Sequence, residues 1–202
     1  MSMIQINSQK NQSGFALLIT ILVMSVVVAV TLAIVELSLK QLKLSVDSTD
    51  SEIAFHAANA GLECARYLRR VESDNFETGN NVDVDCFGYS DTISKQASLG
   101  FITVGVPSNG VVYRYKQSID WGTAPSERCT SLDVITIVAT SSVTIGGIGG
   151  NTLKTRINGY ENDTKTCEAG ERCTIMSVVG YSSACNATST AGVLRREILL
   201  EL

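Results

Sequence analysis

An apolar run near the N-terminus constrains this chain more than any other feature. Residues 15–35 contain neither a charged residue nor a proline. As a helix rising 1.5 Å per residue they would extend about 30 Å, which matches the hydrocarbon core of a bilayer. The run therefore predicts a membrane-spanning helix. Charge leaves its orientation open, because Lys10 precedes the run while Lys40 and Lys43 follow it.

A cleaved secretory signal is the alternative interpretation of this run. Such signals have a shorter apolar core that ends at a small-x-small site, for which "TLA" at residues 31–33 would serve. The helical pattern does not stop there, because apolar residues continue at spacings of three and four with one wider gap and without a proline. They are Leu39, Leu42, Val46, Ile53, Ala57, Ala60 and Cys64. We therefore predict one helix over residues 15–70, with residues 15–35 in the membrane.

Residues 71–202, which follow the predicted helix, are enough to form one globular domain. They are too few to form a second full domain as well. Formal net charge is −4, and the basic residues are scattered rather than clustered. A surface that follows phosphates needs clustered positive charge, so no nucleic-acid partner is indicated.

All six cysteines follow the apolar run, and no C-x-x-C pair occurs among them. An even number beyond a membrane anchor favours an oxidising compartment and up to three disulfides, whereas a zinc ribbon has no support. Fifteen pairings are open, and a short loop from Cys167 to Cys173 is one plausible element. The candidates are Cys64, Cys86, Cys129, Cys167, Cys173 and Cys185.

Short alternating apolar runs bounded by turn residues follow residue 70 and predict strands. Residues 72–91 are polar and rich in turn residues, and we interpret them as a connecting loop. In one run Tyr113 and Tyr115 share a face, which is typical of packing in a half-buried strand. The strand candidates are residues 101–106, 111–119, 132–145, 151–160, 174–182 and 192–202.

A weak internal repeat runs through this part of the chain at an offset of 41 residues. It aligns residues 138–143 with 179–184, and Leu153 and Ile157 with Leu194 and Ile198. Two copies are too few for a solenoid, so the repeat predicts two similar hairpins in an antiparallel sheet. Their connections would be residues 146–150 and 186–192. A long helix followed by such a sheet is an α+β fold.

No pattern in the chain supports catalysis or a bound metal or cofactor. His56 is the single histidine, and no nucleophile motif points to it, so we expect a packed or solvent-edge side chain. Residues 81–85 (NVDVD) alternate like a calcium loop, but Cys86 and Thr92 replace its glycine and glutamate. The glycine-rich residues 146–150 lack the lysine of a phosphate loop. The prediction is therefore a structural protein and not an enzyme.

Two motifs resemble one family. "QSG" followed by "FALLITIL" is similar to a type III (prepilin) leader, which a prepilin peptidase cuts after the glycine before it N-methylates the new terminus. "AFHAANAGLECARY", residues 54–67, resembles the end of the N-terminal region in PilX-like minor pilins and pseudopilins. The resemblance covers about a third of the chain. It implies a leader over residues 1–14, cleavage between Gly14 and Phe15, and a pilin-like fold.

Ile19 departs from the family pattern, in which the fifth residue of the mature helix is usually a glutamate that neutralises the methylated terminus of a neighbouring subunit. PilX-like proteins and the tip pseudopilin of type II secretion systems share that absence. Glu36 is a second departure, at a place where many major pilins have proline. The resemblance thus implies a minor, tip or priming subunit.

The resemblance also implies a location and partners. The chain would sit in the inner membrane with its head outside the cytoplasm, and reach an extracellular filament after assembly. Its partners would be other pilin or pseudopilin subunits, the prepilin peptidase and the inner-membrane assembly platform. Three roles stay open: a type IV pilus subunit, a pseudopilin in protein secretion, and a tip adhesin whose head binds a surface ligand. A membrane-anchored periplasmic enzyme is a further alternative, which the lack of a catalytic constellation disfavours.

Overall fold

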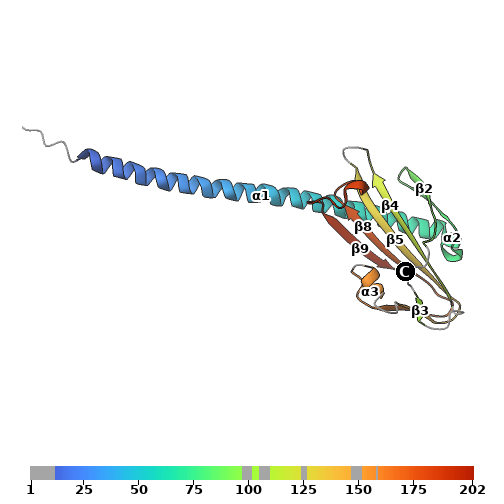
Figure 1. Ribbon diagram of the computed structural model, residues 1–202. Helices are drawn as coiled ribbons and strands as arrows, with labels where there is room; N and C mark the ends of the chain where they lie inside the picture. The colour runs from blue at the N-terminus through green and yellow to red at the C-terminus, as the bar shows by residue number, and fades with distance from the viewer. Residues whose placement is uncertain (1–11, 97–101, 105–109, 124–126, 147–151, 158) are drawn as a thin grey trace, which may run out of the picture. The chain divides into compact units, whose positions relative to one another are not determined.

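The computed structural model of the chain describes residues 12–96, 102–104, 110–123, 127–146, 152–157 and 159–202. The chain divides into two compact units, Met1–Asp47 and Ser48–Leu202, and we call the second unit the head. Helix α1 (Gln12–Val71) contributes to both units (Figure 1). The helix predicted over residues 15–70 is confirmed, since α1 runs without a break over this range and contains no proline.

The head is built around an antiparallel four-stranded sheet of order β4-β5-β8-β9. A β1-β2 hairpin and a three-stranded sheet of order β3-β6-β7 complete it. This α+β architecture confirms the predicted fold class. The elements after α1 are α2 (Ser73–Thr78), β1 (Val82–Cys86), β2 (Tyr89–Ile93), β3 (Ile102–Val104), β4 (Gly110–Trp121), β5 (Arg128–Ala139), β6 (Val143–Gly146), α3 (Leu153–Arg156), β7 (Thr164–Cys167), β8 (Arg172–Tyr181), the 3-10 helix η1 (Cys185–Ala187) and β9 (Arg195–Glu201).

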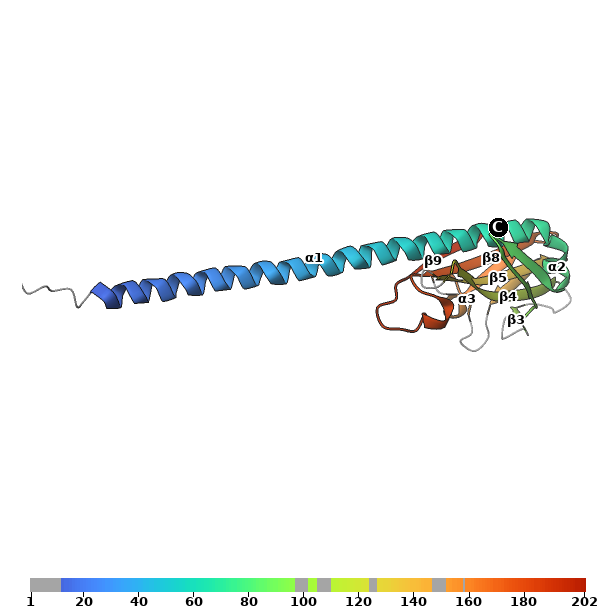
Figure 2. The same cartoon turned by 90° about the horizontal axis from the view of Figure 1, so that it is seen from above.

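The four-stranded sheet has a core on each face, and within the head α1 covers one of them (Figure 2). On the helix side, Leu68 of α1 and Phe76 of α2 pack with Tyr115 of β4. On the other side, Ile135 of β5 packs with Leu153 of α3 and residues of β6 and β7. Because β5 is buried on both faces, apolar residues fill five of the six positions of residues 134–139 (VITIVA) instead of alternating with polar ones.

Small residues let the head's part of α1 lie unusually close to the sheet. A methyl group added at Gly180 would come within 2.1 Å of the Ala54 carbonyl oxygen and 2.3 Å of the Ala58 nitrogen. One added at Gly61 would come within 2.2 Å of the Thr130 methyl carbon. The alanine and glycine pattern of residues 54–61 is therefore what this close helix-sheet packing requires.

The interpretation of residues 72–91 as a connecting loop is wrong. They form α2 and most of the β1-β2 hairpin. In β1 the residues Val82, Val84 and Cys86 are buried while Asp83 and Asp85 are exposed. The polar composition hid a half-buried strand, whose period of two places every aspartate on the solvent side.

The strand predicted over residues 151–160 is also wrong, because α3 lies there. Thr152 caps this helix by accepting a hydrogen bond from the Thr155 backbone nitrogen at 3.3 Å. Leu153 and Ile157 are both buried, and their i, i+4 spacing places them on one side of a helical turn. Since even spacing also places two residues on one face of a strand, the cap distinguishes the alternatives.

The repeat-based hairpins are half confirmed. β8 pairs antiparallel with β9, and their connection contains residues 186–192. The first hairpin is wrong, because β6 leaves the four-stranded sheet and pairs with β3 and β7. Of the predicted connection at residues 146–150, Gly146 is the last residue of β6, and residues 147–150 lie outside the described residues. The predicted strand over residues 132–145 is likewise divided between β5 and β6.

The other strand predictions correspond to observed strands. Residues 111–119 lie in β4, 174–182 overlap β8, and 192–202 contain β9. Of residues 101–106, the described part forms β3. In β4, Tyr115 is fully buried and its hydroxyl lies 3.1 Å and 3.0 Å from the carbonyl oxygens of Asn75 and Asn80. Burial, and then the neighbouring Tyr113, raises the pKa of Tyr115 to about 12, so this ring packs in the core as predicted.

Candidate functional site

The N-terminal part of α1 has the properties of a membrane anchor. It is long and apolar enough to cross a bilayer, and its most apolar stretch has no residue buried within the protein. Large apolar side chains such as Phe15, Leu22 and Val30 are more than half exposed. An apolar helix surface of this extent requires lipid or other helices as its surroundings.

Hydroxyl groups in this segment are satisfied within the helix itself. The hydroxyls of Thr20, Ser25 and Thr31 donate to the carbonyl oxygens of residues 17, 22 and 27 at 2.7–2.8 Å. An unpaired hydroxyl in hydrocarbon is unfavourable by several kcal/mol, so these bonds make the polar residues compatible with lipid. This bonding can be expected from the sequence, because a serine or threonine in a helix can donate to the backbone carbonyl three or four residues earlier.

The candidate cleavage site lies in the first turns of α1. Gly14 and Phe15 are the third and fourth residues of the helix, which begins at Gln12. Phe15 is 69% exposed, and space is open around Gly14. The end of a helix opens more readily than its middle, because it has few intrahelical hydrogen bonds to break. Ile19 is 44% exposed on the same helix.

All six predicted cysteines form disulfides within the head. The pairs are Cys64–Cys86, Cys129–Cys185 and Cys167–Cys173. The first disulfide joins α1 to β1, and the second joins the start of β5 to η1. The third joins the last residue of β7 to the start of β8. The short Cys167–Cys173 loop considered in the sequence is confirmed, while the two longer pairings needed the fold.

Two groups of potential metal ligands occur in the described residues, and both contain a disulfide. They are Asp120 with Cys129 and Cys185, and Glu171 with Cys167 and Cys173. A metal binds thiolate sulfur, and a disulfide sulfur has no such charge. As these cysteines are paired, neither group is a metal site.

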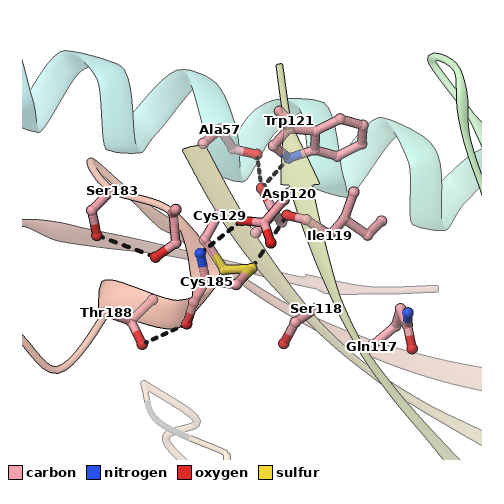
Figure 3. The surroundings of a disulfide bond; sticks show 12 residues. Ala57, Gln117, Ser118, Ile119, Asp120, Trp121, Cys129, Ser183, Cys185 and Thr188 are labelled. Atoms are coloured by element: carbon pink, nitrogen blue, oxygen red, sulfur yellow. Dashed lines mark hydrogen bonds between the residues drawn. A yellow bond between two sulfur atoms is a disulfide. The ribbon is translucent and has the colours of Figure 1, made fainter. Parts of the chain in front are cut away.

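The surroundings of Cys129–Cys185 show how the loop before β9 is held (Figure 3). The Cys185 backbone nitrogen donates to Asp120 Oδ1 at 2.7 Å, and the Cys129 nitrogen donates to the Ser183 carbonyl oxygen at 2.8 Å. Beside them, Trp121 Nε1 donates to the Thr130 hydroxyl at 2.6 Å. These contacts fix the end of β4 against the start of β5.

The same chain of hydrogen bonds reaches the helix. The Thr130 hydroxyl donates to the Ala57 carbonyl oxygen of α1 at 2.7 Å (Figure 3). This carbonyl already accepts within a helix, and its second lone pair is free to bond the sheet at such short range. Trp121, Thr130 and Ala57 therefore link β4, β5 and α1 within the head.

A buried ion-pair network lies at the end of α1. Arg69 donates to Glu77 Oε1 of α2 at 2.9 Å and to the Thr174 hydroxyl of β8 at 2.9 Å. Arg172 lies 3.0 Å from the other oxygen of Glu77. The Arg69 and Glu77 side chains are only 12% and 9% exposed, so Arg69 depends on Glu77 for compensation, while Glu77 is compensated by both arginines.

His56 and the acidic residues of the hairpin are not assembled for catalysis or calcium binding. The His56 side chain is 71% exposed, and Nε2 lies 3.7 Å from Glu52, one turn earlier on α1. Asp83 accepts a hydrogen bond from Thr92 across the hairpin at 2.8 Å. Asp83 and Asp85 belong to a strand rather than to a loop that could wrap an ion.

A shallow apolar groove of about 480 Å³ lies beside α1 in the head. One wall is helical, with Ile53, Ala57 and Ala60, and the other contains Phe87 and Trp121, with His56 and Arg128 also lining it. The Phe87 and Trp121 rings meet edge to face, with centroids 5.7 Å apart. Sequence reasoning missed this groove, because Phe87 lies in the segment interpreted as a loop.

Comparisons of the chain with protein-family models, with curated proteins and with solved structures gave no significant match.

Proposed function

We propose that the chain is a minor subunit of a type IV pilus-like filament, with a structural role in assembly at a tip or priming position. The observation that carries the proposal is a single helix, α1, which begins beside the Gly14–Phe15 site, presents an exposed apolar stretch and ends in the core of the head. A helix of this kind is retained rather than discarded, because the head is folded on its second half.

The mechanism is physical assembly. Helix packing against the helices of other subunits replaces lipid around residues 15–35 with close van der Waals contacts and satisfied hydroxyls. Three disulfides keep the head folded once it is outside the cytoplasm. The partners are other pilin or pseudopilin subunits, the prepilin peptidase and the inner-membrane platform.

Ile19 supports a minor rather than a major position. A buried carboxylate is favourable in an apolar helix bundle only when it meets an opposite charge, and Ile19 offers no such charge to a neighbouring terminus. The subunit would therefore accept a place in which its helix does not neutralise the next one, as at an end of the filament.

The N-terminus of the mature protein tests this proposal. Mass spectrometry of the protein purified from its own membranes should give a terminal Phe15 that carries one added methyl group. A Gly14→Val variant should keep the leader and accumulate as the longer form. A native terminus at any residue other than Phe15 would rule out processing by a prepilin peptidase.

A pseudopilin of a type II secretion system would have the same anchor and head. Deletion of the chain separates the two roles: loss of surface filaments with normal secretion supports the pilus, and loss of secretion with normal filaments supports the pseudopilin. An adhesin role predicts that removing residues 186–192 between β8 and β9 abolishes surface attachment while filaments persist.

A further inference from the structure

The turn of the β1-β2 hairpin has a residue that its backbone disfavours. Cys86 pairs with Tyr89, so Phe87 and Gly88 form a two-residue connection in which both have positive φ, 53° and 85°. Turns of this kind favour Asn-Gly, and a bulky side chain at positive φ is unfavourable by about 1 kcal/mol or more. Phe87 therefore weakens its own hairpin.

The Phe87 side chain does not compensate by entering the core. It is 74% exposed, and its ring forms one edge of the apolar groove, against Trp121. A large aromatic side chain that is exposed and also conformationally disfavoured indicates a surface that another molecule covers.

The groove lies beside an acidic surface. Residues 71–94 contain six acidic residues and no lysine or arginine. One of the six, Glu77, is neutralised by Arg69 in the interior, while Asp83, Asp85 and Asp91 are exposed on the hairpin. Asp85 lines a second depression that adjoins the groove at Phe87, where Glu63 is paired with Arg66 at 3.0 Å. Arg128 lies among the groove's lining residues, so the net negative charge is on the hairpin side of the groove. The molecule that fills the groove should be apolar with positive charge beside it.

One segment of this chain has those properties. Residues 37–46 (LSLKQLKLSV) contain five large apolar residues and two lysines, with no acidic residue. Lys40 pairs with Glu36 at 3.0 Å, so Lys43 supplies the positive charge of the segment. Leu39, Leu42 and Val46 share one side of α1 and are 63%, 65% and 52% exposed. Because residues 15–35 already match a bilayer in length, these side chains would lie outside the hydrocarbon core and require another cover.

We propose that the groove beside Phe87 binds residues 37–46 of a second copy of this chain. Leu39, Leu42 and Val46 would pack on the Phe87 and Trp121 wall, and Lys43, next to them on the helix, would face the acidic hairpin. The contact is heterologous, since groove and segment are different surfaces, so it would place two copies of the subunit side by side at the filament end. It deepens the proposed assembly role, on which it rests.

Site-specific photo-crosslinking of the full chain in its own membranes tests this contact. A benzophenone side chain at position 42 should give a covalent dimer whose cross-linked peptides include Ala60 or Phe87. The matched control carries the same group at position 41, which points away from the stripe and should give little dimer. Equal dimer yield from the two positions, or an adduct of position 42 with a different protein, would overturn the proposal.

Two variants separate docking from folding. Phe87→Asn supplies the residue that the turn favours while removing the ring, so it should lower the dimer yield without lowering the melting temperature. Lys43→Glu should lower the yield by up to about fivefold, the range of an exposed ion pair, and Asp85→Lys should restore it. Unchanged yield in Phe87→Asn contradicts the docking.

The mature N-terminus is determined on the same samples. A missing cross-link in protein that begins at Phe15 overturns the docking alone, because the proposed processing is then intact.

Discussion

Replacing Gly180 by alanine tests the close packing of α1 on the sheet. The new methyl carbon would lie 2.1 Å from the Ala54 carbonyl oxygen and 2.3 Å from the Ala58 nitrogen, and both are backbone atoms that no rotamer change can move. To restore ordinary contact, the head's part of α1 must withdraw from β8 by about 1 Å.

Two effects set the magnitude of the loss. Overpacking of this kind destabilises by about 1–3 kcal/mol. Withdrawal of the helix also lengthens the 2.7 Å bond from the Thr130 hydroxyl to the Ala57 carbonyl, which contributes about 1 kcal/mol. Together they should lower the free energy of unfolding by about 2–4 kcal/mol and the melting temperature by roughly 4–16 °C.

Near-ultraviolet circular dichroism of the full chain in detergent would follow unfolding of the head, because Trp121 lies in the helix-sheet contact. Gly192→Ala is the matched control, since it has open space around it and a positive φ, and it should destabilise by about 1 kcal/mol from backbone strain alone. Gly61→Ala should fall between them, because it meets side chains that can shift and gains about 1 kcal/mol of helix propensity. A Gly180→Ala protein that melts at the same temperature as Gly192→Ala would refute the reasoning.

Three further predictions concern a disulfide and two ion pairs of the head. Replacing Cys64 and Cys86 together by alanine opens a loop of 22 residues and should destabilise the oxidised protein by about 3 kcal/mol, measured by urea unfolding; an unchanged midpoint would contradict the chain-entropy explanation. Glu77→Gln leaves Arg69 as a buried, uncompensated charge and should lower the free energy of unfolding by about 3 kcal/mol, whereas Glu77→Gln with Arg69→Met should recover part of that loss in the same assay. Lys165 of β7 donates a hydrogen bond to Glu201, and this bond holds the pKa of the Glu201 carboxyl below its ordinary value. The Glu201 carboxylate therefore stabilises the fold above about pH 4.5, and this stabilisation is lost as the pH falls through the lowered pKa. Unfolding followed from about pH 5 to about pH 3 should show a steeper loss of stability in the wild type than in Glu201→Gln, and identical slopes would count against the linkage.

Local pattern was sufficient wherever one period dominated a long stretch. The apolar run and the apolar spacing of three and four residues that follows it predicted α1, because residues three and four apart lie on the same side of a helix. The positions of β8 and β9 in the sequence were also predictable, since the apolar residues of each strand lie in a compact run between turn residues.

Local pattern failed where two structures share a spacing or where composition hides a period. Leu153 and Ile157 are four residues apart, which suits either a strand or the helix α3. The aspartates of residues 82–86 suggested a loop, although their alternation with valine is that of a half-buried strand. At residues 82–86 the burial that distinguishes the alternatives comes from residues distant in the chain, whereas at α3 the distinguishing feature is the local Thr152 cap.

The sequence by itself determined an apolar run long enough to span a membrane, the long helix and an even number of cysteines, because each is a property of neighbouring residues or of composition. Only the tertiary structure decided the two longer disulfide pairings, why Ala54, Ala58 and Gly61 are small, and where Phe87 lies. These depend on α1, β5 and β8 meeting within a few ångströms, and such contacts join residues up to about 120 positions apart, such as Ala58 and Gly180. Chain neighbours do not record that proximity, which is set by how the layers pack.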